Sequence, residues 1–321
     1  MNKEIMSRLI GAALLAAAPA GALAQDNYPS RMIKIILPIP GGGSADILPR
    51  IVADKLAARW GRPVIVENRP GGALNIGAEA VAKAEPDGYT LLATPPPPLA
   101  TNQSLYPKLG FDPNAFVPVT VMAITPNVLV ANPKVPFSTI QGLVAFAKAN
   151  PGKLTYASSG AGSTVHLAME LLKIQTGIEI LHVPYKGLVP TDLLAGRVDL
   201  MFNNLGNTLP QIKSGALKVL AVGSEKRLAA LPDVPAVSET LSGFVYTTWF
   251  AVVAPPKSPP EIAAKLSAAI AEILRLPDVA ERIRDLSMTP VGSTPAETAA
   301  FIQDERERWR KVIVSAGIKP D

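Results

Sequence analysis

The sequence predicts an α/β protein in which largely parallel strands alternate with helices in two domains. Short β-branched runs recur between stretches of helical hydrophobic spacing, and glycine-rich loops join several of these runs to the helix that follows. Alternation at this spacing indicates a parallel sheet covered on both faces. A length of 321 residues corresponds to about two domains.

The N-terminus has the pattern of a secretory signal. Lys3 and Arg8 precede a short apolar run, and a small-x-small motif ends at Ala24. Pro19 interrupts the apolar stretch, which disfavours the alternative of a membrane anchor, because a spanning helix needs about 20 continuous apolar residues. We therefore expect residues 1–24 to be a signal peptide cleaved after Ala24, and the mature protein to be periplasmic.

The first mature segment shows the strand, loop and helix pattern clearly. Residues 32–38 form a β-branched run, a glycine loop follows, and Ser44 is placed to cap a helix that extends to about Trp60. The alternation then continues with a strand over 63–67, a helix over 75–84, and a strand over 89–93 that ends at Thr94.

A second set of units follows. We expect strands over residues 127–131, 154–157, 179–183, 198–202, 217–222 and 247–253, helices over 139–149, 165–174 and 191–195, and further helical segments between 260 and 316. The last helices have no sheet of their own, so they are expected to return to the first domain. This predicts residues 25–124 plus 254–321 as one domain and 125–253 as the other, joined by two hinge crossings near 127–131 and 248–253.

The composition argues against several kinds of site. With no cysteine, the chain has neither a disulfide framework nor a thiolate zinc site. Its two histidines and its carboxylates show no metal-ligand spacing, so neither a metal nor another cofactor is expected. The net charge of +5 is spread along the chain without the basic stripe of a nucleic-acid binder, and a mild positive field suits an anionic ligand.

Catalytic motifs are missing from the sequence. It has no Gly-x-Ser-x-Gly elbow, no Walker A sequence and no Gly-x-Gly-x-x-Gly fingerprint. His182 lies on an expected strand, and His166 lies in the helix after the second glycine loop. We therefore expect a binding protein without catalytic residues. The alternative is an exported α/β hydrolase that uses Ser159 or Ser163 with His166 as its base.

Two loops rich in neutral donors are the candidate ligand-binding elements. Residues 40–44 and residues 158–164 each follow a strand and open a helix, where unpaired backbone N–H groups and the helix dipole attract an anion. The carboxyl ends of parallel strands face the crevice in which ligands bind. Asp46, in the first turn of its helix, either stabilises that helix or supports the site indirectly.

These residues resemble a known family. The segments Pro38-x-Pro-Gly-Gly-Gly-Ser-x-Asp46, Val66-Glu67-Asn68-Arg69-Pro70-Gly71-Gly72, Tyr156-Ala157-Ser158-Ser159-Gly160 and His182-Val183-Pro184-Tyr185-Lys186-Gly187 are similar to those of Bug proteins, the periplasmic solute-binding components of tripartite tricarboxylate transporters. The resemblance covers nearly the whole mature chain. It implies the type II periplasmic binding protein fold, with two doubly wound α/β domains joined by two hinge crossings and a ligand cleft between them.

The resemblance also implies ligand contacts. With the capping Ser44, the supporting Asp46 and the nearby His166, the expected ligand-binding residues are Pro40, Gly42, Gly43, Ser44, Asp46, Thr94, Ser159, Gly162, Ser163, Thr164, His166 and Asn203. Family members commonly have Asp-Asn where this chain has Asn203-Asn204, which disfavours a ligand with a cationic amine. We expect a monomer whose partners are a small carboxylate and the membrane components of the transporter, or alternatively a sensor receptor.

Overall fold

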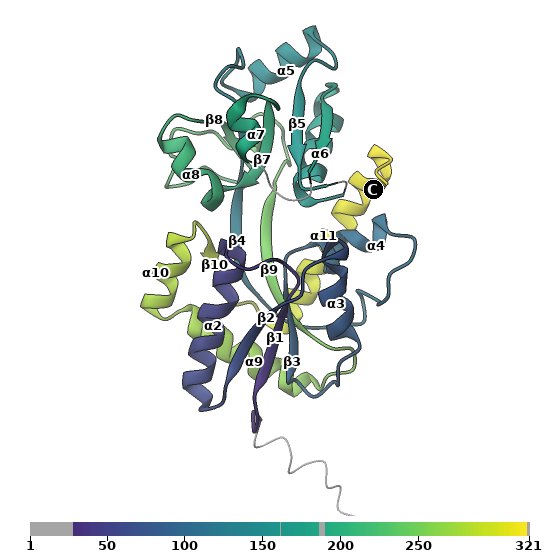
Figure 1. The fold of residues 1–321 in the computed structure, drawn as a ribbon, viewed down its shortest axis with the longest axis vertical. Helices are drawn as coiled ribbons and strands as arrows, with labels where there is room; N and C mark the ends of the chain where they lie inside the picture. The colour runs from purple at the N-terminus through teal and green to yellow at the C-terminus, as the bar shows by residue number, and fades with distance from the viewer. Residues whose placement is uncertain (1–27, 161, 186–189, 320–321) are drawn as a thin grey trace, which may run out of the picture.

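The computed structural model describes residues 28–160, 162–185 and 190–319. Two lobes are stacked along the long axis of the molecule, and extended strands pass between them (Figure 1). Among the described residues, no helix is long and apolar enough to cross a membrane.

The sheet of the first lobe combines parallel and antiparallel strands. It contains β1 (Ile33–Leu37), β2 (Val64–Asn68), β3 (Thr90–Thr94), β4 (Val117–Ala131), β9 (Thr247–Ala254) and β10 (Thr289–Pro290). β1 pairs in parallel with β2 and β3, whereas β9 runs antiparallel to both β3 and β4. β10 pairs antiparallel with β4.

The sheet of the second lobe shares β4 with the first. It adds β5 (Thr155–Ser158), β6 (Leu181–Pro184), β7 (Leu200–Asn204) and β8 (Lys218–Val222). β5 is parallel to β6 and β7, and β4 is antiparallel to β7 and β8. The continuous order is therefore β2-β1-β3-β9-β4-β7-β5-β6, with β8 and β10 attached to β4.

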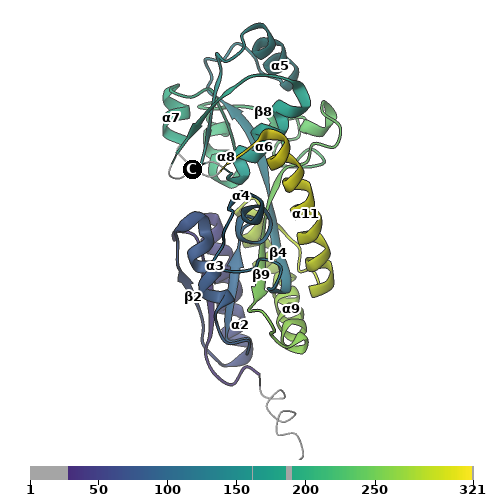
Figure 2. The ribbon, with the colours of Figure 1, turned by 90° about the vertical axis from the view of Figure 1, so that its right-hand side faces the viewer.

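Helices surround both sheets. Those of the first lobe are α2 (Ser44–Trp60), η1 (Gly72–Leu74), α3 (Asn75–Ala82), η2 (Pro97–Thr101), α4 (Asn102–Leu105), α9 (Pro260–Leu274) and α10 (Pro277–Asp285). Those of the second lobe are α5 (Ile140–Ala149), α6 (Thr164–Thr176), α7 (Pro190–Ala195), α8 (Leu205–Lys213) and η3 (Val237–Glu239). The last helix, α11 (Pro295–Ala316), runs alongside both lobes (Figure 2).

The ends of α2 and α6 follow local sequence rules, with one correction. Both helices end at a left-handed glycine, Gly61 (φ 62°) and Gly177 (φ 67°). Ser163 is the N-cap of α6, and its hydroxyl accepts the His166 N–H. The cap predicted at Ser44 is wrong: Gly43 is the N-cap of α2, with no side-chain cap bond, and Ser44 is already helical.

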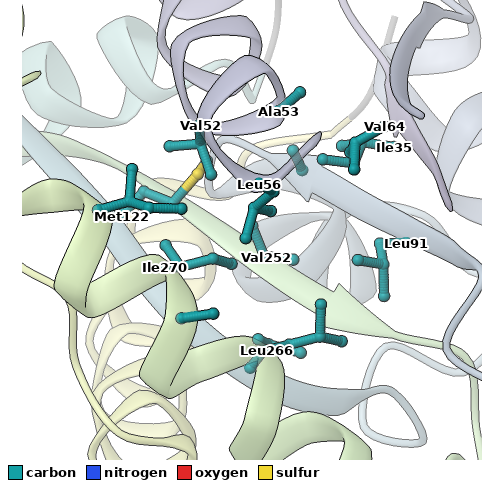
Figure 3. Close-up of a cluster of buried hydrophobic side chains, with 14 of the residues drawn as sticks. Ile35, Val52, Ala53, Leu56, Val64, Leu91, Met122, Val252, Leu266 and Ile270 are labelled. Atoms are coloured by element: carbon teal, nitrogen blue, oxygen red, sulfur yellow. The ribbon is translucent and has the colours of Figure 1, made fainter. Parts of the chain in front are cut away.

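The core of the first lobe lies between its sheet and the helices α2 and α9. Leu56 of α2 and Leu266 of α9 are fully buried against Leu91 of β3 and Val252 of β9 (Figure 3). Burying each side chain of this size stabilises the fold by roughly 1.5–3 kcal/mol. The packing fixes the direction of α2, and so the position of its N-terminus.

Helix α11 joins the cores of the two lobes. Ile302 packs into a first-lobe cluster with Trp249 of β9, whereas Trp309 packs into the main core of the second lobe. Buried Glu305 accepts hydrogen bonds from the indole nitrogens of Trp249 and Trp309, each at 3.0 Å. One carboxylate therefore ties α11 to the strand that passes between the lobes.

The predicted α/β class is confirmed, and the sheets are mixed because β4 and β9 run against their neighbours. Most predicted strands and helices agree with the structure within a few residues. Several features were not expected: the extension of β4 back to Val117, the helical stretch over η2 and α4, α8, and the short elements η1, η3 and β10.

Candidate ligand-binding site

A pocket of about 430 Å³ lies between the lobes. Its first-lobe wall comes from the glycine loop and α2, from η1, and from the segment after β3; these residues are Ile39, Pro40, Gly43, Ser44, Ala45, Ala73, Leu74, Pro95, Pro97, Asn102 and Tyr106. The remaining wall comes from the second lobe and β9, through Ser159, Gly162, Ser163, Thr164, Val165, Asn204, Asn207, Thr248 and Phe250.

The first glycine loop is held from behind by Asp46. Its carboxylate accepts the Gly42 N–H at 3.0 Å, two hydrogen bonds from the Arg50 guanidinium, and one from Asn68 Nδ2 at 2.9 Å. The same Asn68 amide donates to the carbonyl of Ile39 at the start of the loop. Asp46 therefore shapes the loop without lining the pocket, while the first N–H groups of α2 lie at the pocket wall.

The ionisation of Asp46 is secured by these contacts. Burial opposes the charge, but the hydrogen bonds from Arg50, Asn68 and Gly42 outweigh it and lower the pKa of Asp46 to about 2. The carboxylate is thus charged at any pH near neutrality. Its charge is paired with Arg50 and is not offered to the ligand.

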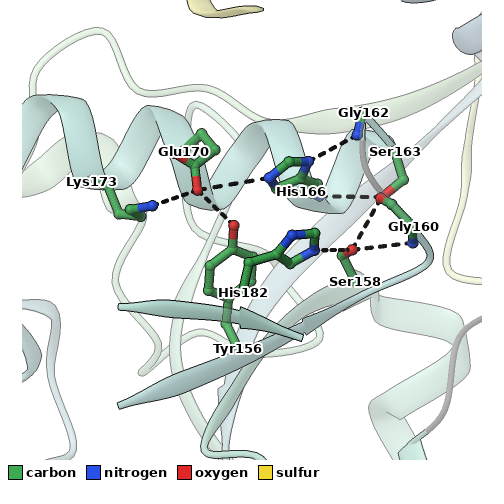
Figure 4. A network of polar contacts seen from close by, with 9 residues as sticks. All are labelled: Tyr156, Ser158, Gly160, Gly162, Ser163, His166, Glu170, Lys173 and His182. Atoms are coloured by element: carbon green, nitrogen blue, oxygen red, sulfur yellow. Dashed lines mark hydrogen bonds and ion pairs between the residues drawn. The ribbon is translucent and has the colours of Figure 1, made fainter. Parts of the chain in front are cut away.

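The second glycine loop is held by serine and histidine side chains. The Ser163 hydroxyl donates to the carbonyl of Gly160 at 2.7 Å, and the Gly162 N–H donates to His166 Nδ1 at 2.8 Å (Figure 4). The backbone at position 162 has a positive φ of 73°, which favours glycine. The absence of a side chain on Gly162 also lets Leu105 of α4 approach closely. The N-terminus of α6 thereby lies at the pocket wall opposite α2.

The segment between β2 and α3 has an unusual backbone. Gly71, Gly72, Ala73 and Leu74 all have positive φ, and Ala73 and Leu74 line the pocket. Such a conformation costs a non-glycine residue about 1–2 kcal/mol, and it persists where the surrounding structure enforces it. Asn102 provides this support by donating to the carbonyl of Ala73 at 2.9 Å and to Asn75 Oδ1 at 2.7 Å.

The wall at the junction of β4, β7 and β9 is made of amides and a hydroxyl. Asn127 Nδ2 donates to Thr248 Oγ1 at 3.1 Å, and Thr248 donates in turn to Asn204 Oδ1 at 3.2 Å. Asn204 and Thr248 line the pocket, whereas fully buried Asn203 accepts the Asn204 N–H behind it. Neighbouring strand residues point to opposite faces, which places Asn204 where Asn203 was expected.

The structure brings seven of the predicted ligand-binding residues to the pocket wall: Pro40, Gly43, Ser44, Ser159, Gly162, Ser163 and Thr164. The other five lie outside the lining, namely Gly42, Asp46, Thr94, His166 and Asn203. Besides Asn204, sequence reasoning missed Asn102, Tyr106, Asn207 and Thr248 as polar lining residues. Among them only Thr248 carried a signal, because it lies on a predicted crossing strand.

Every described residue that lines the pocket is uncharged. An anion there would be bound by helix N-termini, hydroxyls and amides, with an apolar surface supplied by side chains such as Leu74 and Phe250. Within the described ranges, no three His, Asp or Glu side chains gather closely enough to hold a metal ion.

The arrangement gives little support to a serine nucleophile. Ser163 uses its hydroxyl to donate to Gly160, and His166 Nδ1 already accepts the Gly162 N–H. Ser158 Oγ lies 2.6 Å from His182 Nε2, but Ser158 is 1% exposed and is not part of the pocket wall (Figure 4). A nucleophile needs both a base and access to the substrate.

Two α/β lobes, strands that pass between them, and a donor-rich pocket at their junction define a two-domain solute-binding protein. The model of the TctC family, described as "Tripartite tricarboxylate transporter family receptor", matches residues 48–318. The chain belongs to this family.

Comparisons with individual proteins agree with this assignment. Protein BugT of Bordetella pertussis is 39% identical over 324 residues, which span 99% of each chain. Among solved structures, Rpa4515 of R. palustris with adipate has 36% identity and a TM-score of 0.83, covering 92% of this chain and 100% of that one. MatC of Rhodopseudomonas palustris with bound malate has 29% identity and a TM-score of 0.78, and the match covers 89% of this chain and 100% of that one. The resemblance to Bug proteins and the type II fold are thus confirmed.

Proposed function

We propose that this protein is an extracytoplasmic receptor that captures a small mono- or dicarboxylate between its lobes, leaves it chemically unchanged, and delivers it to the membrane components of a tripartite tricarboxylate transporter. One observation carries the proposal: the N-termini of α2 and α6, with their serine and threonine hydroxyls, meet at a single pocket with no charged residue in its described lining. The adipate and malate named for two related structures support a carboxylate.

The pocket suits a carboxylate because its N–H and hydroxyl groups can replace the water molecules that hydrogen-bond to the free anion. A buried carboxylate is costly unless its oxygens accept hydrogen bonds, and charge-assisted bonds from N–H and hydroxyl groups are stronger than neutral ones. Ser44 and Ala45 open one helix at the wall, and Thr164 and Val165 open the other. Two such ends match the two charged ends of a dicarboxylate.

Capture is proposed to involve movement of the lobes. We assign residues 25–124 plus 254–321 to one domain and 125–253 to the other, with β4 and β9 as the hinge. The sharing of β4 by both sheets supports this division. The chain is proposed to act as a monomer after export and cleavage behind Ala24, so intact mass measurement of the periplasmic protein should give a chain that begins at Gln25.

Calorimetric titration of the purified protein with malate and adipate tests the proposal. At least one of them should bind saturably with one site per chain. Asn204→Asp should weaken that binding by roughly 100-fold or more, because it adds a like charge to the pocket wall. Gln303→Glu adds the same charge on an exposed part of α11 and serves as the control. If no member of a carboxylate library bound to the folded protein, the proposal would be wrong.

A further inference from the structure

The two glycine loops share one local design. In each loop, the N–H of the glycine before the helix N-cap is accepted by the side chain at the third helical position: Gly42 donates to Asp46 at 3.0 Å, and Gly162 donates to His166 Nδ1 at 2.8 Å. Both glycines have positive φ, 100° and 73°. Each acceptor fixes the peptide that immediately precedes the donor-rich helix N-terminus.

The two acceptors differ in charge, and so do the residues one turn further along. Arg50 follows Asp46 by four residues and pairs with it at 3.0 Å. Glu170 follows His166 by four residues, and its Oε1 lies 3.8 Å from His166 Nε2. The first loop thus depends on an ionised carboxylate, and the second depends on an imidazole.

The protonation state of His166 decides whether it can accept the Gly162 N–H. A neutral imidazole has one acceptor nitrogen, whereas both nitrogens of the cation are donors. Acceptance at Nδ1 therefore requires a neutral ring that carries its proton on Nε2, which faces Glu170. With a proton on Nδ1, that N–H and the Gly162 N–H would both be donors and would repel each other. The hydrogen bond that holds the loop peptide would then be lost.

Among the described residues, groups of β5, β6 and α6 lie close to His166. His182 of β6 stacks on its ring with centroids 4.0 Å apart, and Tyr156 of β5 lies 6.1 Å away. On α6 itself, Glu170 is already paired with Lys173 at 2.7 Å and accepts the Tyr156 hydroxyl at 2.6 Å. Burial and that hydrogen bond raise the pKa of Tyr156, so its hydroxyl stays a donor.

Three features of this surrounding oppose a cation at His166. The carboxylate of Glu170 is shared with Lys173 and Tyr156, the His166 side chain is 9% exposed, and the positive end of the α6 dipole is close by. Protonation would consequently be coupled to the loss of the bond to Gly162.

We propose that His166 is a positioning residue that holds the second loop in its ligand-binding conformation only while the imidazole is neutral, so that carboxylate affinity falls when this ring is protonated. The inference rests on the proposed function. Asp46 stays charged through the same range, so the first loop does not take part in this response. Histidine ordinarily titrates between about pH 5 and 8, which sets the range to study.

Malate titrations at pH 7.5 and pH 5.5 test the inference, with the ratio of the two Kd values as the readout. Malate changes its own protonation between these values, but it does so equally for every variant. His166→Asn keeps an acceptor near the position of Nδ1 and cannot be protonated there. The ratio should be about tenfold larger for the parent protein than for His166→Asn, as expected for the loss of one hydrogen bond.

His182→Gln is the matched control, because the chain has only two histidines. It should keep the large ratio of the parent. If His182→Gln abolished the pH response, or if His166→Asn kept it, the assignment to His166 would be overturned. Absence of malate and adipate binding at both pH values would instead refute the proposed function.

A measurement on the unmodified ring guards against a variant that fails to fold. In untagged protein labelled with ¹⁵N in both histidine and glycine, the ring signals come from only two imidazoles. At pH 7.5 one ring should show an unprotonated Nδ1 and a protonated Nε2, and this ring should titrate together with the Gly162 amide signal. A His166 ring protonated at Nδ1 at pH 7.5 would contradict the inference directly.

Discussion

At the scale of single residues, Asp46 illustrates how a site can depend on a group that the ligand does not contact. Its side chain is 7% exposed and connects Gly42, Arg50 and Asn68, so the loop geometry is set before any ligand arrives. Preorganised donors bind an anion better because the cost of ordering them is met during folding.

Asp46→Asn should lower the free energy of unfolding at pH 7 by about 1–2 kcal/mol, since the bonds of a charged acceptor are lost while solvent screens part of the Arg50 interaction. The pKa of Asp46 falls on folding from 3.8 to about 2, so its stabilisation is complete above about pH 5 and declines as the pH falls through 2. Urea unfolding at pH 7 and pH 3 should show the difference between parent and variant narrowing at the lower pH.

Asp278→Asn is a suitable control for this experiment, because Asp278 is an exposed carboxylate paired with Lys55. It should lower the urea midpoint at pH 7 much less than Asp46→Asn does, because exposed ion pairs contribute little. An Asp46→Asn protein as stable as this control would show that the buried network contributes nothing measurable.

The residue scale also sets the limit of prediction from sequence. Donor-rich loops at Ser44 and Ser163 were predicted from residue type and position alone, because glycine, serine and a following helix are local features. Sequence alone did not show that Asn204, and not Asn203, lines the pocket, because this depends on which face of β7 meets the pocket. The contribution of Asn102 depends on contact with the distant Ala73 turn.

At the scale of elements, the approach of α4 to the second loop matters most for the pocket. A Cβ atom at Gly162 would lie 2.4 Å from Leu105 Cδ1, and Leu105 is 6% exposed within the second-lobe core. The leucine has little room to move away. The close packing of Leu105 of α4 therefore leaves room only for a glycine at position 162 of the second loop.

Gly162→Ala should weaken malate binding by more than tenfold, through both the clash with Leu105 and the positive φ of 73°. Gly177→Ala is the matched control: its φ is 67°, and nothing lies within 4 Å of the added Cβ. It should cost about 1 kcal/mol of stability and leave affinity unchanged. Thermal unfolding and malate calorimetry measure both quantities.

A double variant separates the two causes. If the clash dominates, Leu105→Ala should restore most of the affinity that Gly162→Ala loses. A double-mutant cycle would then show a large coupling energy between the two substitutions. If Leu105→Ala left the affinity loss of Gly162→Ala unchanged, backbone strain at the positive φ of 73° would account for that loss.

Element boundaries were predicted well where the pattern is local and poorly where prolines interrupt it. The ends of α2, α6 and α11 follow from glycines beyond their last turns. β4 was recognised only in its last part, because Pro118 and Pro126 lie within it and proline lacks the N–H that a strand uses. α8 was missed for the similar reason that it contains Pro210.

At the scale of the whole molecule, the connections between the lobes constrain how they can move. β4 and β9 pass from one lobe to the other as a paired antiparallel ribbon, and α11 packs on the cores of both (Figure 2). Glu305 of α11 accepts a hydrogen bond from the indole N–H of Trp249 on β9. A rotation that bends the ribbon would keep this local attachment while closing the pocket.

Distances between labels test this closure, and the absence of cysteine makes specific labelling straightforward. Cysteines at Lys148 of α5 and Glu281 of α10, two exposed positions on different proposed domains, carry spin labels. Saturating malate should shorten and narrow their distance distribution, because the carboxylate favours the state in which both helix N-termini contact it. The pair Lys83 and Glu281, both exposed on the first lobe, should be unaffected. If malate bound in calorimetry but left the first pair unchanged, capture would occur in a rigid pocket and the assignment of β4 and β9 as a hinge would fail.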